Sequence, residues 1–96
     1  MNYTFNDDSP IFQQLAKALE DDIFLCTYKE GSAIPSTTEL SVALHINPAT
    51  VLKAMNLLLD EGLIEKKRGI GMFVKEGAVE KINDRRKSLF KSKFLT

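Results

Sequence analysis

The sequence predicts a mainly α-helical fold with a small β-hairpin: a winged helix-turn-helix followed by a C-terminal helix. Two short amphipathic segments, residues 36–44 and 47–61, meet at a tight turn. Two short strands joined through glycines follow at residues 63–75. Residues 9–28 and 78–95 repeat apolar side chains at spacings of three and four, which is typical of helices.

The length of 96 residues suits one small domain with a thin core, which self-association would help to stabilise. We divide it into an N-terminal arm (1–8), a winged helix-turn-helix (9–76) and a helical dimerisation tail (77–96). The arm could be extended or disordered. No apolar run is long enough for a membrane helix, residues 1–8 do not resemble a signal peptide, and the single Cys26 cannot form an internal disulfide. We therefore expect a cytoplasmic protein with no membrane association.

The formal net charge is zero, but the charge is unevenly distributed. Residues 1–46 carry two Lys/Arg against seven Asp/Glu, a net −5, whereas residues 47–96 carry eleven against six, a net +5. A basic half favours a nucleic-acid face over a uniformly solvated surface, although a charge run alone is weak evidence.

The first helix is predicted to start at Ser9-Pro10, with Ser9 as the cap and Pro10 in the first helical position. It should end near Tyr28. One face is expected to be buried, and it consists of Ile11, Leu15, Leu19, Ile23 and Cys26. On this face Cys26 fits a small core residue better than a redox or metal-binding group.

The second helix should begin with a capping box, in which Ser36 and Glu39 bond each other's backbone N–H groups. Ala43 is expected to face inward and let the next helix approach. His45 stands where a helix-turn-helix needs a left-handed residue, and it has no nearby Cys or His that would make it a metal ligand.

The third helix should begin with Asn47 as its cap and Pro48 in the first position. Its predicted buried stripe is Val51, Ala54, Met55, Leu58 and Leu59. The opposite face carries Ala49, Thr50, Lys53 and Asn56, so it begins small and polar and then carries a cation. Such a face suits the major groove, but an ordinary solvated helix could show the same pattern.

Residues 63–67 and 72–75 are expected to pair as a hairpin whose tip carries Lys66, Lys67 and Arg68. A cationic tip beside a recognition helix suits contact with DNA phosphates. The tail helix has an approximate stripe of Val79, Ile82, Arg86, Leu89 and Phe90, which Phe94 continues. This stripe could pack on its own domain or on a second copy, and we favour the second copy.

Residues 9–75 resemble the DNA-binding domain of the GntR family of bacterial transcription regulators. The similarity lies in Pro10-Ile11-Phe12-Gln13-Gln14-Leu15, Ile34-Pro35-Ser36, Asn47-Pro48-Ala49-Thr50-Val51, and Glu61-Gly62-Leu63-Ile64 with Gly69, Gly71, Phe73 and Val74. The segment 46–54 and the short tail are most similar to the YtrA-type branch. Members of that branch dimerise through a brief helical extension.

The resemblance implies a set of DNA-contacting residues: Ser36, Thr37, Thr38, Asn47, Ala49, Thr50, Lys53, Lys67, Arg68, Gly69 and Gly71. Thr38 departs from the family pattern, which usually has Arg there. His45 replaces the usual turn glycine, and Ile70 occupies a position that is often polar or basic.

We therefore expect a sequence-specific regulator of transcription, a homodimeric repressor that binds double-stranded DNA at a palindromic operator. The alternative is a winged-helix module for protein contact. An enzyme is not expected, since the chain has one His, one Cys and no phosphate-binding loop. No cofactor is predicted, and the sequence does not identify a small-molecule effector.

Overall fold

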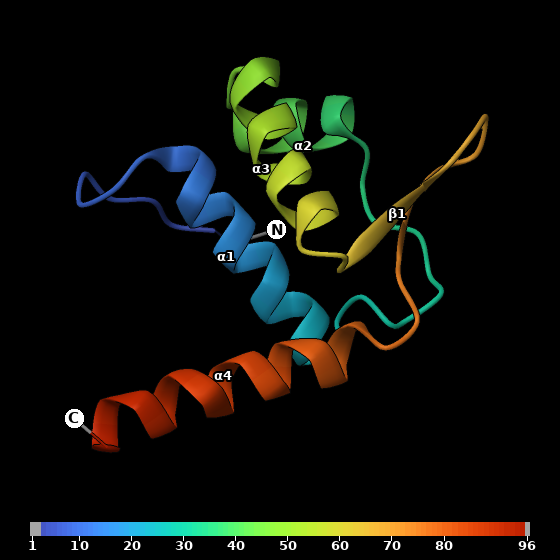
Figure 1. Cartoon of the computed structure of the whole chain (residues 1–96). Helices are drawn as coiled ribbons and strands as arrows, with labels where there is room; N and C mark the ends of the chain where they lie inside the picture. The colour runs from blue at the N-terminus through green and yellow to red at the C-terminus, as the bar shows by residue number, and fades with distance from the viewer. Residues whose placement is uncertain (1–2, 96) are drawn as a thin grey trace.

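The computed structural model describes residues 3–95, with side chains described for residues 3–89 (Figure 1). The elements in chain order are α1 (Ile11–Phe24), α2 (Thr37–Leu44), α3 (Pro48–Asp60), β1 (Ile64–Lys67), β2 (Gly71–Val74) and α4 (Ala78–Leu95). Helix α1 is central, because it packs against α3 on one side and against α4 on the other. The predicted fold class, mainly helical with one antiparallel hairpin, is confirmed.

The core is built from apolar residues of every helix and of the hairpin. Its largest fully buried side chains are Leu15, Leu19, Ile23, Leu40, Val51, Met55, Leu58, Leu63, Val74 and Ile82. No polar or charged side chain is buried among the described residues. Burial of about ten such side chains is the main source of stability for this small domain.

Helix α1 is shorter than the sequence predicts, and both of its ends differ. Pro10 occupies the N-cap position with no side-chain cap, so the predicted Ser9 cap is wrong. At the other end Leu25 is the C-cap and Cys26 takes a left-handed conformation with φ 62°, so the chain leaves the helical path before Tyr28. Cys26 is consequently exposed, and its predicted place in the core is wrong. Apolar periodicity alone does not reveal where a left-handed residue ends a helix.

The hairpin has a third partner that the sequence did not suggest. The strands pair from Ile64 with Val74 to Lys67 with Gly71, one residue away from the predicted limits. On the other edge of β2, the loop before α2 adds backbone hydrogen bonds from Gly31 to Val74 and from Ile34 to Met72. Because this loop leads directly into α2, the base of the hairpin is tied to the helix-turn-helix.

The first turns of helix α4 join the core of its own domain. Ala78 and Ile82 are fully buried, so this part of the helix packs on its own domain rather than on a second copy. Farther along, Leu89 is 65% exposed. The side chains of Phe90 and Phe94, which belong to the predicted stripe, lie outside the described residues.

Charged contacts fix α4 across the end of α1. Arg85 pairs with Glu20 and, at 2.8 Å, with Glu61 at the end of α3. Arg86 pairs with Asp21 at 2.6 Å and stacks over the ring of Phe24 at 4.5 Å. Ion pairs that share side chains in this way contribute more to the stability of the fold than isolated surface ion pairs, because the shared side chains are already ordered.

The first turn of α4 is capped from a distant part of the chain. The Glu30 carboxylate accepts the N–H groups of Gly77 and Val79, each at 3.0 Å. These two backbone hydrogen bonds lower the pKa of Glu30, because they stabilise its charged form. The negative charge also complements the positive end of the helix dipole.

The N-terminal arm packs on α1 from Tyr3 onward, which favours the ordered alternative for this segment. The Tyr3 hydroxyl donates a hydrogen bond to the Asp22 carboxylate. The side-chain NH₂ group of Gln14 donates to the backbone carbonyls of Asn6 and Ser9. Burial raises the pKa of the Tyr3 hydroxyl, and the hydrogen bond to Asp22 raises it further. None of the helices in the described part of the chain is long and apolar enough to cross a membrane.

Candidate nucleic-acid interface

The start of α2 carries the first group of predicted contact residues. The Ser36 hydroxyl accepts the Glu39 N–H at 3.1 Å, and the Glu39 carboxylate accepts the Ser36 N–H at 3.2 Å, so the predicted capping box is present. Thr38 is exposed and Thr37 is half-buried. The hydroxyls and free backbone N–H groups at this helix start can donate hydrogen bonds to a phosphate.

The turn between α2 and α3 is held by Ser41, a residue that the sequence analysis did not single out. Its hydroxyl donates to the Ile46 carbonyl at 2.6 Å, and its own carbonyl accepts from the Ile46 N–H at 3.1 Å. Between them, His45 has φ 55° and ψ 45°, so the predicted left-handed turn residue is confirmed. Ala43 is exposed, and its predicted inward position is wrong.

Helix α3 starts as predicted. The Asn47 side chain accepts the Ala49 N–H at 2.8 Å, and Pro48 takes the first helical position. The buried stripe consists of Val51, Ala54, Met55 and Leu58, while the predicted fifth member, Leu59, is half-buried. Because the side-chain oxygen of Asn47 caps the helix, the side-chain NH₂ group of Asn47 is the part that can reach a DNA partner.

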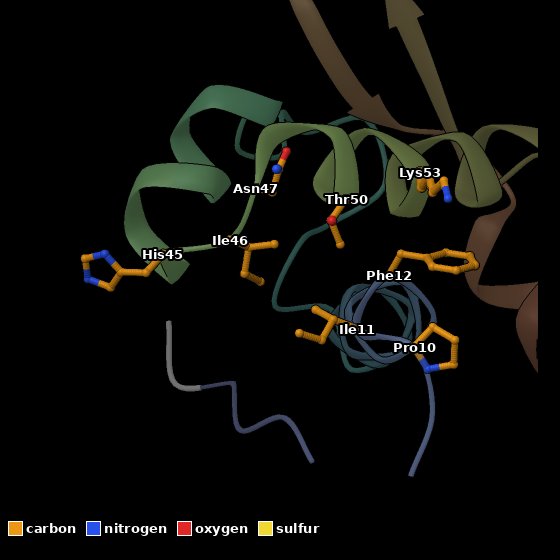
Figure 2. Close-up of a pocket in the computed structure, with 8 residues that line it drawn as sticks. All are labelled: Pro10, Ile11, Phe12, His45, Ile46, Asn47, Thr50 and Lys53. Carbon is orange, nitrogen blue, oxygen red and sulfur yellow. The ribbon is translucent and has the colours of Figure 1, made fainter. Parts of the chain in front are cut away.

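The outer face of α3 is not uniform. Ala49, Leu52, Lys53 and Asn56 are exposed, whereas Thr50 is half-buried. In Figure 2 the Thr50 side chain points toward α1, and the Lys53 ammonium lies 5.4 Å from the ring centroid of Phe12. Thr50 and Lys53 therefore lie on the α1 side of the helix, while Leu52 lies farther round, away from α1.

An open groove of about 500 Å³ separates the start of α1 from α3 (Figure 2). It is lined by Pro10, Ile11 and Phe12 of α1, by His45 and Ile46 of the turn, and by Asn47, Thr50 and Lys53. Ile11 is exposed along this groove rather than buried, so its predicted place in the core is wrong.

The hairpin tip carries the second group of predicted contact residues. Lys66, Lys67 and Arg68 are all exposed, and the Lys67 ammonium lies 4.5 Å from the ring centroid of Phe73. The turn is closed by the Ile70 N–H, which donates to the Lys67 carbonyl at 2.9 Å.

Gly69 and Gly71 have φ values of 77° and 139°, and a Cβ on either would meet nothing within 4 Å. The turn therefore needs glycine for its backbone angles rather than for space. Ile70, between them, is 73% exposed at the tip.

The two groups lie on the same side of the molecule. In Figure 1 the hairpin extends beside α2 and α3, on the side of α1 opposite α4. Neither group forms a site for metal chemistry, since no cluster of His, Cys, Asp or Glu among the described residues could hold an ion. The arrangement is an extended surface with a helix in its middle and cations at one edge. Leu52 of this surface was not named in the sequence analysis, although its helical spacing from Ala49 and Asn56 could have indicated it.

Known proteins with the same sequence pattern and fold are transcription regulators. Residues 11–74 match the family described as "Bacterial regulatory proteins, gntR family". The chain is 36% identical over 70 residues to the HTH-type transcriptional repressor YtrA of Bacillus subtilis, a match that covers 73% of this chain and 54% of YtrA. The chain therefore spans about half the length of that relative.

Solved structures extend the similarity to α4. A GntR family transcriptional regulator from Listeria monocytogenes superposes with a TM-score of 0.84 at 27% identity, over 95% of this chain and 82% of that one. YtrA from Sulfolobus acidocaldarius, described as a GntR-family transcription factor, superposes with a TM-score of 0.76 at 28% identity, over 97% and 84% of the two chains. These relatives are regulators rather than enzymes, as expected, and they agree with the predicted YtrA-type branch. The chain belongs to the GntR family of bacterial regulatory proteins.

Proposed function

We propose that this chain is a sequence-specific repressor that binds double-stranded DNA as a dimer. Helix α3 lies in the major groove of one half-site, and the hairpin tip contacts the flanking backbone. The observation that carries the proposal is the arrangement of the elements: the hairpin, whose tip carries the exposed Lys66, Lys67 and Arg68, extends beside α2 and α3 on the side of α1 opposite α4 (Figure 1).

The contacts divide by chemistry. The α2 start, with Ser36, Thr37 and Thr38, and the tip, with Lys67 and Arg68, are suited to phosphates, which position a protein on DNA without reading its sequence. The glycines Gly69 and Gly71 let the tip backbone approach the duplex closely. Helix α3 is the element suited to contact base edges, because its exposed residues are small or uncharged except for Lys53.

The exposed side chain of Leu89 in α4 supports dimerisation. Leu89 lies beyond the part of α4 that is buried in its own core, and a second copy would cover it. Two-fold symmetry then implies a palindromic operator whose half-site centres lie about one helical turn apart. The dimer would act in the cytoplasm, and no effector is assigned.

A salt titration of DNA binding tests the proposal. Fluorescence anisotropy with a duplex of the promoter upstream of the chain's own gene should give an affinity that falls steeply with salt, because phosphate contacts release counterions. The double variant Lys67→Ala/Arg68→Ala should lower the salt slope by about two units. Its matched control, Lys17→Ala/Lys29→Ala, removes the same charge from the acidic half and should leave the slope unchanged.

A protein-contact module remains the second candidate, because large apolar side chains are exposed on this surface: Val42 on α2, Leu52 on α3 and Ile70 at the tip. The same titration separates the two functions. A protein-contact module would show weak binding to both promoter and random duplex, with no preference between them.

A further inference from the structure

The helix-turn-helix, residues 36–60, is poor in cations. Between Ser36 and Asp60, which includes α2, the turn and α3, Lys53 is the sole Lys or Arg. Its ammonium lies over the Phe12 ring on the α1 side of α3. The commonest specific contact in the major groove is Arg or Lys to the O6 and N7 atoms of guanine. Helix α3 therefore has little means of reading guanine.

Leu52 is an exposed apolar residue on the part of the α3 surface that lies away from α1. It is 51% exposed, with Ala49 one turn before it and Asn56 one turn after it on the same side of α3. Ala49 is small enough to let the helix approach the base edges closely. The apolar group that DNA offers in the major groove is the C5-methyl of thymine, and the bidentate partner of an Asn amide is adenine.

We propose that Leu52 is a specificity-determining residue that contacts thymine methyl groups, while Asn56 pairs with a neighbouring adenine. The half-site under α3 is then read as A·T pairs. This inference rests on the proposed DNA-binding function and adds to it the class of sequence that is recognised. Burial of one methyl-sized group against Leu52 corresponds to about a fourfold gain in affinity.

The first experiment selects duplexes from a random pool with the purified full chain. The enriched half-sites should contain A·T pairs at the positions nearest α3. Each thymine of the selected duplex is then replaced by uracil, which removes the methyl group and keeps the base pair. The wild-type chain should lose about fourfold in affinity at each contacted thymine.

The variant Leu52→Ala should bind the thymine and uracil duplexes equally, because the side chain that detects the methyl group is gone. The matched control is Leu25→Ala, which truncates a leucine that is also exposed but lies after α1. It should keep the full preference for thymine. Circular dichroism and sedimentation of both variants check that fold and oligomeric state are unchanged.

Two failures can be distinguished. Salt-dependent binding with no preference for thymine over uracil, or selected half-sites that are G·C at these positions, would overturn the role of Leu52 and leave the proposed DNA-binding function intact. The absence of binding to any duplex would overturn both. The comparison of thymine with uracil needs only the wild-type chain, so the test holds even if Leu52→Ala does not fold.

Discussion

The Lys53 ammonium lies 5.4 Å from the ring centroid of Phe12, so the single cation of α3 is held against the start of α1. An ammonium over an aromatic ring keeps its opposite side open to solvent, because the ring covers only one of its faces. The contact fixes the position of this charge on the exposed face of α3. It places Lys53 on the α1 side of α3, where we expect it to contact a phosphate rather than a base edge.

The substitution Lys53→Glu should weaken duplex binding about tenfold at low salt and reduce the salt slope by about one unit, since one phosphate contact is lost. Gel shifts and anisotropy with the promoter duplex measure both quantities. Lys17→Glu, which makes the same charge change on an exposed position of α1, is the control and should bind like wild type. Unchanged binding by Lys53→Glu, with the fold intact, would remove Lys53 from the contact set.

The left-handed turn at His45 gives a prediction about stability. Because the backbone there has φ 55° and the side chain is exposed, only the backbone conformation matters. His45→Gly should be at least as stable as wild type, whereas His45→Val should lose about 1–2 kcal/mol, since a β-branched residue tolerates positive φ poorly. Urea unfolding followed by circular dichroism provides the comparison. Equal stability of the Val and Gly variants would contradict this account of the turn.

Local chemistry made much of this fold predictable from the sequence. The Ser36–Glu39 capping box, the Asn47-Pro48 helix start and the His45 turn all depend on residues close in sequence, and the structure contains each of them. The end of α1 was mispredicted because Cys26 continues the apolar period, although the backbone there turns left-handed.

Contacts between distant segments could not be foreseen. The pairing of residues 31–34 with β2, the Glu30 cap on α4 and the position of Lys53 over Phe12 join parts of the chain that no periodicity connects. The exposed face of α3 also depends on contacts between distant segments. Leu52 belongs to a helical face that the spacing defines, but its exposure depends on how α2 and α1 flank α3.

The Glu30 cap predicts a pH-dependent contribution to stability. The folded-state pKa of Glu30 is lower than its ordinary value of 4.5, so the charged carboxylate stabilises the fold above that pH, and this contribution is lost as the pH falls through the folded pKa. Glu30→Gln should therefore be less stable than wild type at neutral pH, and the difference should shrink in acid. Urea unfolding of both proteins, from neutral to acid pH, measures the difference between their free energies of unfolding. A difference that does not change with pH would mean that the charge of Glu30 has no part in capping α4. The control is Glu76→Gln, which neutralises an exposed carboxylate next to Gly77 in sequence.

The two halves of α4 should respond differently to truncation of an apolar side chain. Ile82 is fully buried against its own domain, so Ile82→Ala should lower the free energy of unfolding by about 2–5 kcal/mol at any protein concentration, because it leaves a cavity. Leu89 is 65% exposed, so Leu89→Ala should barely affect a monomer but should weaken the proposed dimer. Sedimentation equilibrium measures the dimer dissociation constant, and urea unfolding at several protein concentrations separates the two effects, since only dimer stability depends on concentration. If Leu89→Ala leaves the dissociation constant unchanged while wild type dimerises, the second copy is held by a surface other than this side chain.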